Sequence, residues 1–232
     1  MLDQAFEALK TYDWGAERNA LNPINDAVLS SRNDAAARLE LETKLAAALK
    51  TEISRDAKDF VCRKLMLMGS AACVPTLAEL LGNKELSHMA RFALERIPGP
   101  EAAQALRDAL GKIAVPLKIG VLSSLGQRRD AASVPAIAGL LGDAEASIAR
   151  AAAMALGAIR TSEAAKALAS AKPAHAETQP AITDASLSCA EGLLTAGNKG
   201  EALGIYKSLL GEGQPKHVKL AATRGMLACA GK

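Results

Sequence analysis

The chain has 232 residues, of which half are apolar and 3% aromatic, and its formal net charge is +3 at pH 7. This length suffices to bury a core, in one extended domain or two small ones. A core poor in aromatic side chains favours closely packed helices over sheets, so we expect an all-α protein. The small net charge is weak evidence for a polyanionic partner, and the positive excess lies in residues 52–172.

The N-terminal sequence Met1-Leu2-Asp3 lacks the basic segment and apolar stretch of a signal peptide. The longest apolar run, residues 151–159, is far shorter than the roughly 20 residues of a membrane span. We therefore expect a soluble cytoplasmic protein with no membrane insertion. An export segment already removed from a precursor would leave no trace in this sequence.

Residues 1–54 form the first predicted segment, a helical cap made of degenerate repeats. Asp13, Asn33 and Ser54 are the expected helix caps, and Pro23 is expected to kink or split the second helix. Apolar periodicity predicts helices over about residues 2–10, 15–31, 34–50 and 55–68.

Tyr12 and Trp14 are the aromatic pair near this end of the chain. We interpret them as packing of the N-terminal hairpin, with anchoring of a bound peptide as the alternative.

Residues 55–172 form the second segment and repeat with a period near thirty residues. The stretch "AACVPTLAELLGN" at residues 71–83 returns as "AASVPAIAGLLGD" at residues 131–143. Equivalent positions recur in ladders with steps of 29, 31 and 31 residues, which indicate tandem structural repeats. The ladders are Leu65, Leu94, Leu125 and Leu156; Met68, Ile97, Arg128 and Ile159; Val74, Ala103, Val134 and Ala165; and Leu77, Leu106, Ile137 and Leu168.

Each repeat is expected to hold two short helices. In "VPTLAELLG" the proline belongs to the first helical turn and the glycine ends the helix. The following helix, such as "SIARAAAMALGAI", places apolar residues at i, i+3, i+4 and i+7, so neither helix can hide its apolar face alone. Stacking of neighbours completes the core and predicts an α-solenoid, a stack of antiparallel helix pairs. Gly126 and Gly157 are expected to let helices approach closely, whereas Met66 and Glu95 fill that site in the other repeats.

The pattern in "VPAIAGLLGDAEASIARAAAMALGAI" resembles HEAT repeats, in particular the short PBS-lyase-type form of about thirty residues. The match is strongest over residues 131–160, good over 55–130 and weaker elsewhere. The resemblance implies a HEAT-like solenoid whose second helices line a concave surface. It does not define a function, because such repeats serve scaffolds, adaptors, lyases and nucleic-acid enzymes alike.

Residues 173–232 form the third segment, expected to be divergent helical hairpins that cap the array. The connector "KPAHAETQP" at residues 172–180 contains two prolines. Beyond it, Leu194, Gly197, Ala202 and Tyr206 are spaced in a way that resembles a tetratricopeptide hairpin. A terminal unit that differs from the rest is typical of repeat proteins.

The sequence contains no recognisable catalytic, cofactor-binding or metal-binding set. His88, His175 and His217 lie in different elements, and none is four residues from another candidate ligand. The four cysteines lack a Cys-x-x-Cys spacing, so we interpret them as buried small apolar residues, with a disulfide between any two as the alternative.

The second helices of the repeats carry charged residues that the resemblance would place in a groove. Acidic residues share these helices and stacking aromatics are nearly absent, so we interpret these positions as a solvated surface of mixed charge. The alternative is a groove that binds a protein or peptide partner. Its candidate residues are Lys58, Asp59, Arg63, His88, Arg91, Lys118, Arg128 and Arg150.

Three functions are compatible with these observations. The favoured one is a non-catalytic interaction or scaffolding module that binds a protein or peptide partner. One alternative, which the repeat type suggests, is a bilin-lyase-like enzyme or subunit that binds a small molecule through Arg91, Arg128 or Arg150. The other is weak nucleic-acid binding through a basic stripe, which the shortage of aromatics disfavours.

Overall fold

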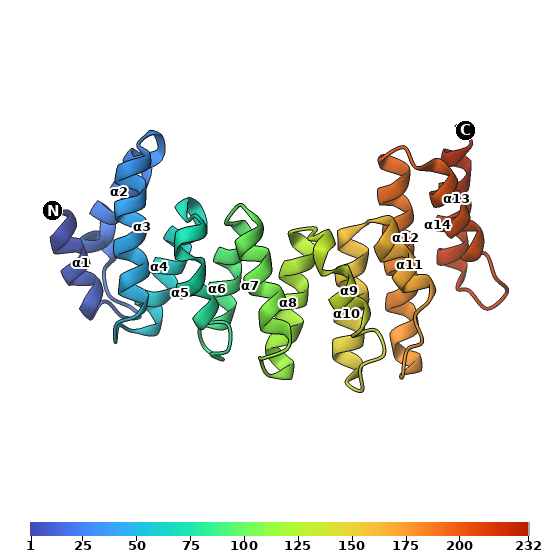
Figure 1. The fold of residues 1–232 in the computed structure, drawn as a ribbon, viewed down its shortest axis with the longest axis horizontal. Helices are drawn as coiled ribbons and strands as arrows, with labels where there is room; N and C mark the ends of the chain where they lie inside the picture. Colours follow the sequence, from blue (N-terminus) through green and yellow to red (C-terminus); the bar gives the residue numbers. More distant parts are fainter. Residues whose placement is uncertain (232) are drawn as a thin grey trace. The chain divides into compact units, whose positions relative to one another are not determined.

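The computed structural model describes residues 1–231, and all regular secondary structure in that range is helical (Figure 1). The chain divides into two compact units, Met1–Val121 and Leu122–Lys232. The expected all-α, solenoid-like fold class is confirmed. The predicted division at residues 54 and 172 concerns the type of repeat and stays a prediction.

Unit 1 contains seven α-helices and most of an eighth within the described residues. Its helices follow one another in chain order, and short 3-10 turns precede several of them (Figure 1). They are α1 (Leu2–Thr11), α2 (Asn22–Ser30), α3 (Ala35–Leu49), α4 (Arg55–Met68), α5 (Val74–Glu79), α6 (Ser87–Arg96), α7 (Pro100–Leu110) and α8 (Val115–Gln127), whose last residues belong to unit 2.

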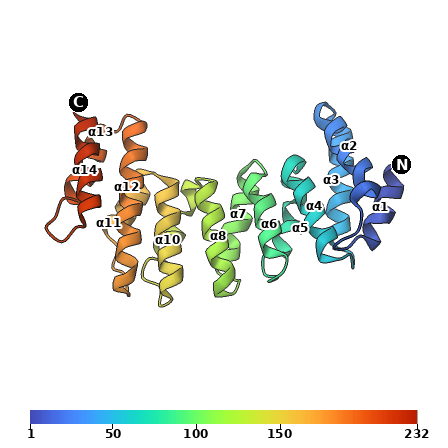
Figure 2. The same ribbon diagram turned by 180° about the vertical axis from the view of Figure 1, so that it is seen from behind.

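Unit 2 continues with α9 to α14. Figure 2 shows α12, α13 and α14 side by side at the C-terminal end, where each packs against the other two. The helices are α9 (Val134–Ala138), α10 (Ala146–Ile159), α11 (Ser162–Ala169), α12 (Gln179–Thr195), α13 (Lys199–Ser208) and α14 (Lys216–Cys229).

Helices of successive repeats pack in two rows within each unit. In unit 1, α4 packs against α6 and α5 against α7; in unit 2, α10 packs against α12 and α9 against α11. The ladder leucines Leu65, Leu94, Leu125 and Leu156 are all fully buried. Every apolar member of the other three ladders is buried as well, and Arg128 is half-buried. The predicted periodicity therefore marks the core of a helical repeat fold.

Two glycines allow close helix packing in unit 2, as expected. A Cβ atom on Gly157 would lie 2.7 Å from the Cα of Ala185 in α12, and one on Gly126 would lie 3.2 Å from the Cα of Ala155. Because these neighbours are backbone atoms of a packed helix, a side chain at either glycine would push two helices apart.

The N-terminal helices differ from the prediction in two places. Residues 15–17 are not helical, so Asp13 caps no helix and its carboxylate accepts a hydrogen bond from Trp14 N at 2.8 Å. The second helix is split as expected, because a 3-10 turn precedes α2 and Pro23 lies in the first turn of α2. Asp34, not Asn33, caps α3 by accepting from Ala36 N and Ala37 N at 3.0 Å. Ser54 caps α4 as predicted.

Two helices that start with Val-Pro, α5 and α9, end earlier than expected. Pro75 and Pro135 lie in the first turn, as predicted, but α5 ends at Glu79 and α9 at Ala138. Turns with i to i−3 hydrogen bonds, such as Leu81 N to Ala78 O at 3.1 Å, carry the chain on to Gly82. The α-helix therefore ends in a tighter turn with i to i−3 hydrogen bonds, before the glycine is reached.

A buried carboxylate, which the sequence analysis missed, joins α3 to the turn between α4 and α5. Glu42 is 2% exposed, and its Oε1 accepts from Ser70 N at 2.8 Å and from Cys73 N at 3.1 Å. The Ser70 hydroxyl lies 2.9–3.0 Å from both carboxylate oxygens. A buried charge with this many donors is stabilising, since each N–H would otherwise lack an acceptor.

Candidate functional site

The surface made by α4, α6 and the loop at residues 12–18 is the strongest candidate site. Along α6, His88, Phe92 and Arg96 recur every four residues, so their side chains share one face of the helix. They border a hollow of about 340 Å³ between α4 and α6, which we call the α4–α6 hollow. Its lining residues are Asp59, Cys62, Arg63, Met66, His88, Met89, Phe92, Ala93 and Arg96.

A second hollow, of about 240 Å³, adjoins it, and we call it the Trp14 hollow. Its lining residues are Tyr12, Trp14, Arg18, Asp56, Asp59, Phe60 and Arg63. Asp59 and Arg63 line both hollows, and Arg63 Nε donates to Asp59 Oδ2 at 2.8 Å. The two hollows therefore share this ion pair.

The loop that carries Trp14 is held by contacts of Tyr12. The hydroxyl of Ser54 donates to Tyr12 O at 2.6 Å, and Arg18 Nε donates to Tyr12 Oη at 3.0 Å. The Tyr12 ring is buried, with its centre 6.5 Å from that of Phe60. Trp14, in contrast, is 83% exposed, so the expectation that both aromatics pack in the N-terminal hairpin is wrong for Trp14.

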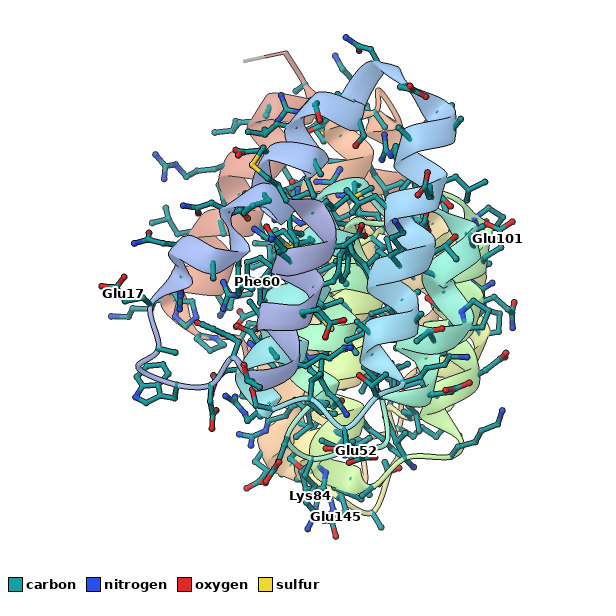
Figure 3. All side chains as sticks on the ribbon, turned by 90° about the vertical axis from the view of Figure 1, so that its left-hand side faces the viewer. Glu17, Glu52, Phe60, Lys84, Glu101 and Glu145 are labelled. Atoms are coloured by element: carbon teal, nitrogen blue, oxygen red, sulfur yellow. The ribbon has the colours of Figure 1, made fainter. Side chains whose placement is uncertain are left out.

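The site lies on one side of unit 1. In Figure 3, Glu17 lies at the left-hand edge and Phe60 somewhat left of the centre, whereas Glu101 of α7 lies at the right-hand edge. Glu101 borders a separate hollow of about 740 Å³ between α5 and α7, together with Val74, Pro75 and Lys112. The two faces of the helix stack therefore carry different hollows.

Positive charge and desolvation govern the titration of the site. Burial and then Arg91, whose guanidinium lies 2.9 Å from the Nδ1 of His88, lower the pKa of His88. Burial, followed by the charges of Arg63 and Arg18, lowers the pKa of Lys64, whose Nζ lies 4.6 Å from the centre of the Phe60 ring. Both shifts disfavour additional positive charge on this face.

The Cys62 thiol, at the floor of the α4–α6 hollow, is unreactive at neutral pH. Burial, and next the negative charge of Asp59, raise the pKa of Cys62 to about 12. A thiol that stays protonated is neither a nucleophile nor a metal ligand at neutral pH. Burial also raises the pKa of Cys73 to about 12 and that of Cys189 to about 11, and all four cysteines are free.

The structure brings together part of the predicted groove. Asp59, Arg63 and His88 line the α4–α6 hollow, and the guanidinium of Arg91 adjoins it, 5.2 Å from the centre of the Phe92 ring. Lys58 and Lys118 are half-buried in unit 1 and line neither hollow.

The last two predicted residues, Arg128 and Arg150, belong to unit 2. Arg150 borders a hollow of about 540 Å³ there, with Met154 and Asp184.

Sequence reasoning missed the aromatic and apolar part of the site. Phe92 is 39% exposed, and Met66 and Arg96 border the same hollow. The available signal was the His88, Phe92, Arg96 spacing of four, which places an aromatic residue between two polar ones on a single helix face.

Residues 1–231 contain no cluster of three or more His, Cys, Asp or Glu side chains arranged to hold a metal ion. Every helix in that range is also too short or too polar to cross a bilayer.

No family model and no curated protein matches this chain. Among solved structures, an engineered protein is similar over 90% of this chain and 97% of its own, with a TM-score of 0.44 and 19% identity. Human deoxyhypusine hydroxylase in complex with glycerol is similar over 100% of this chain and 96% of its own, with a TM-score of 0.39 and 17% identity. A second engineered protein is similar over 97% of this chain and 71% of its own length, with a TM-score of 0.44 and 18% identity. At this level of similarity, none of them carries an argument about function.

Proposed function

We propose that this chain is an interaction module with HEAT-like repeats, which binds a peptide segment of a protein partner on the surface of α4, α6 and residues 12–18. The observation that carries the proposal is Trp14, which is 83% exposed beside a hollow that it helps to line. An exposed tryptophan leaves a large apolar surface in water, and tryptophan is enriched among the residues that dominate binding energy.

The shape and composition of the surface support the same function. Trp14, Phe60 and Phe92 come from three different elements and border two adjoining hollows. An apolar floor with a polar rim is the usual anatomy of a protein interface. The Cys62 thiol, by contrast, is buried and has a raised pKa, so this residue offers no activated nucleophile.

The proposal is tested by selecting random peptides displayed on phage against the full chain, then measuring binding of the enriched peptides to variants. Trp14→Ala and Phe92→Ala each remove an exposed ring from the surface, and we expect about tenfold weaker binding or more. Leu39→Ala is the matched control, because Leu39 is an exposed apolar residue of α3 that lines neither hollow.

Circular dichroism and thermal unfolding of each variant establish that it is folded. The proposal is contradicted if no peptide is enriched, or if the enriched peptides bind Trp14→Ala and Phe92→Ala as tightly as they bind the unchanged protein.

A further inference from the structure

We infer that the peptide bound on this surface is acidic, with an apolar side chain that enters the α4–α6 hollow and flanking carboxylates that pair with Arg18, Arg63 and Arg96. The inference rests on the proposed function and adds the chemical class of the ligand. It follows from the floor of the hollow, the placement of the guanidinium groups and the balance of charge around them.

The floor of the α4–α6 hollow is apolar. Cys62, Met89 and Ala93 are at most 5% exposed, and Met66 adds a half-buried thioether. Methionine side chains adapt their shape and make favourable contacts with aromatic rings. The floor therefore fits an aliphatic or aromatic side chain rather than a charged one.

Guanidinium groups stand at the rim of both hollows. Arg96 borders the α4–α6 hollow, Arg18 borders the Trp14 hollow, and Arg63 borders both. Within residues 1–231, neither Arg18 nor Arg96 forms an ion pair with a carboxylate. The Nε–H of Arg18 donates a hydrogen bond to the Tyr12 hydroxyl, and its terminal N–H groups make no hydrogen bond in the described part of the chain. An arginine with terminal N–H groups to spare matches a carboxylate in a bidentate geometry.

The charge balance around the hollows favours an anion. Asp56 lies 3.4 Å from Arg55 and Asp59 lies 2.8 Å from Arg63, so the two carboxylates that line the hollows already have cationic neighbours. The cations nevertheless outnumber the carboxylates on α4, α6 and the preceding loop. The cations are Arg18, Arg55, Lys58, Arg63, Lys64, Arg91 and Arg96, and the carboxylates of these two helices and of residues 12–18 are Asp13, Glu17, Asp56, Asp59 and Glu95.

The titration of the neighbouring groups agrees with this balance. After burial, the charges of nearby arginines are the next cause that lowers the pKa values of His88 and Lys64. A carboxylate placed beside these groups would offset that repulsion, whereas a lysine of a basic peptide would add to it.

The dimensions indicate the length of the binding segment. Eight residues separate His88 from Arg96, which corresponds to about 12 Å along α6. An extended peptide covers that distance in about four residues, at roughly 3.3 Å per residue. Two apolar residues with acidic neighbours on either side therefore cover this length. Because successive side chains of an extended peptide point to opposite sides, one of the two apolar side chains faces the hollow.

The test uses three sets of synthetic, end-capped, tryptophan-free hexapeptides. Each set varies the two central residues among Leu, Ile, Val, Met and Phe, and the flanking residues are Glu and Asp, or Gln and Asn, or Lys only. Trp14 is the only tryptophan of the chain, so its fluorescence reports binding at the site directly. We expect the acidic set to contain saturable binders about tenfold tighter than their amide counterparts, weakened by added salt.

Variants locate the effect. Arg63→Gln and Arg96→Gln should each weaken the best acidic peptide about tenfold while leaving its amide counterpart unchanged. Lys112→Gln is the control, because Lys112 borders the hollow between α5 and α7 and its replacement removes the same charge.

The outcomes separate this inference from the proposed function. Equal binding of the acidic and amide sets, tighter binding of the lysine set, or no acidic binder at all would overturn the acidic ligand. If neutral or basic peptides from the phage selection still need Trp14 and Phe92, the proposed function stands and only the ligand chemistry fails. If no peptide of any charge depends on these rings, both fail.

Discussion

Replacing Gly157 by alanine tests whether close packing of successive helices holds the repeat fold together. The new Cβ would lie 2.7 Å from the Cα and 2.9 Å from the Cβ of Ala185, which is closer than van der Waals contact allows. Because the nearest atom belongs to the backbone of α12, no side-chain rotation relieves the clash, and α10 and α12 must separate.

The magnitude follows from two opposing terms. Overpacking of a core costs about 1–3 kcal/mol, whereas alanine gains about 1 kcal/mol over glycine within a helix. We expect a net loss of about 1 kcal/mol, which lowers the melting temperature of a unit of about 110 residues by roughly 4 °C. Gly204→Ala is the matched control, because Gly204 lies within α13 of the same unit and its Cβ would meet nothing within 4 Å. There the helix term acts alone, so this variant should gain up to about 1 kcal/mol.

The assay is unfolding in urea followed by far-ultraviolet circular dichroism, with both variants beside the unchanged protein. Opposite signs for the two substitutions support the packing. The reasoning is refuted if Gly157→Ala is as stable as Gly204→Ala, since the contact with Ala185 would then have no energetic consequence.

The other predictions concern buried and titratable groups. Glu42→Ala should cost about 2–4 kcal/mol in urea unfolding, because Ser70 N and Cys73 N lose a charged acceptor inside the core; an unchanged midpoint would contradict this. NMR titration should give His88 a pKa below 6.5, because burial and then the charge of Arg91 disfavour the protonated ring; a value above 6.5 would contradict this. Because the unfolded chain then binds this proton more strongly, His88 contributes fully to the free energy of unfolding above pH 6.5, and the contribution decreases as the pH falls toward the folded pKa. His88→Gln should therefore make the free energy of unfolding depend less on pH in this range. A thiol reagent at mildly alkaline pH should modify Cys229 first, because the other three thiols are buried and have raised pKa values. Rapid modification of Cys62, Cys73 or Cys189 in the folded protein would contradict this.

The repeat core was predictable from sequence because its packing problem recurs. Leu65 and Leu156 occupy the same place in different repeats, and both are fully buried. Aligning the repeats on one such position therefore identifies the buried positions of every repeat. Ser54 and Pro75 were also predictable, because capping and proline placement depend on the adjacent backbone.

The site was less predictable because distant contacts determine it. The exposure of Trp14 depends on the loop that Ser54 and Arg18 hold through Tyr12, and no local pattern encodes that arrangement. Glu42 looked like one of many surface acids of an alanine-rich helix, yet its partners are the backbone N–H groups of residues 28 and 31 positions later. Lys118 was a candidate for the predicted groove but lines neither hollow.

Mapping of amide chemical shifts by NMR, with the best peptide from the phage selection added to the full chain, tests the central claim most directly. We expect the largest changes on α4 and α6 around Arg63, His88 and Phe92, together with the side-chain N–H of Trp14. Changes that concentrate on α5 and α7, or that spread evenly over unit 1, would contradict it.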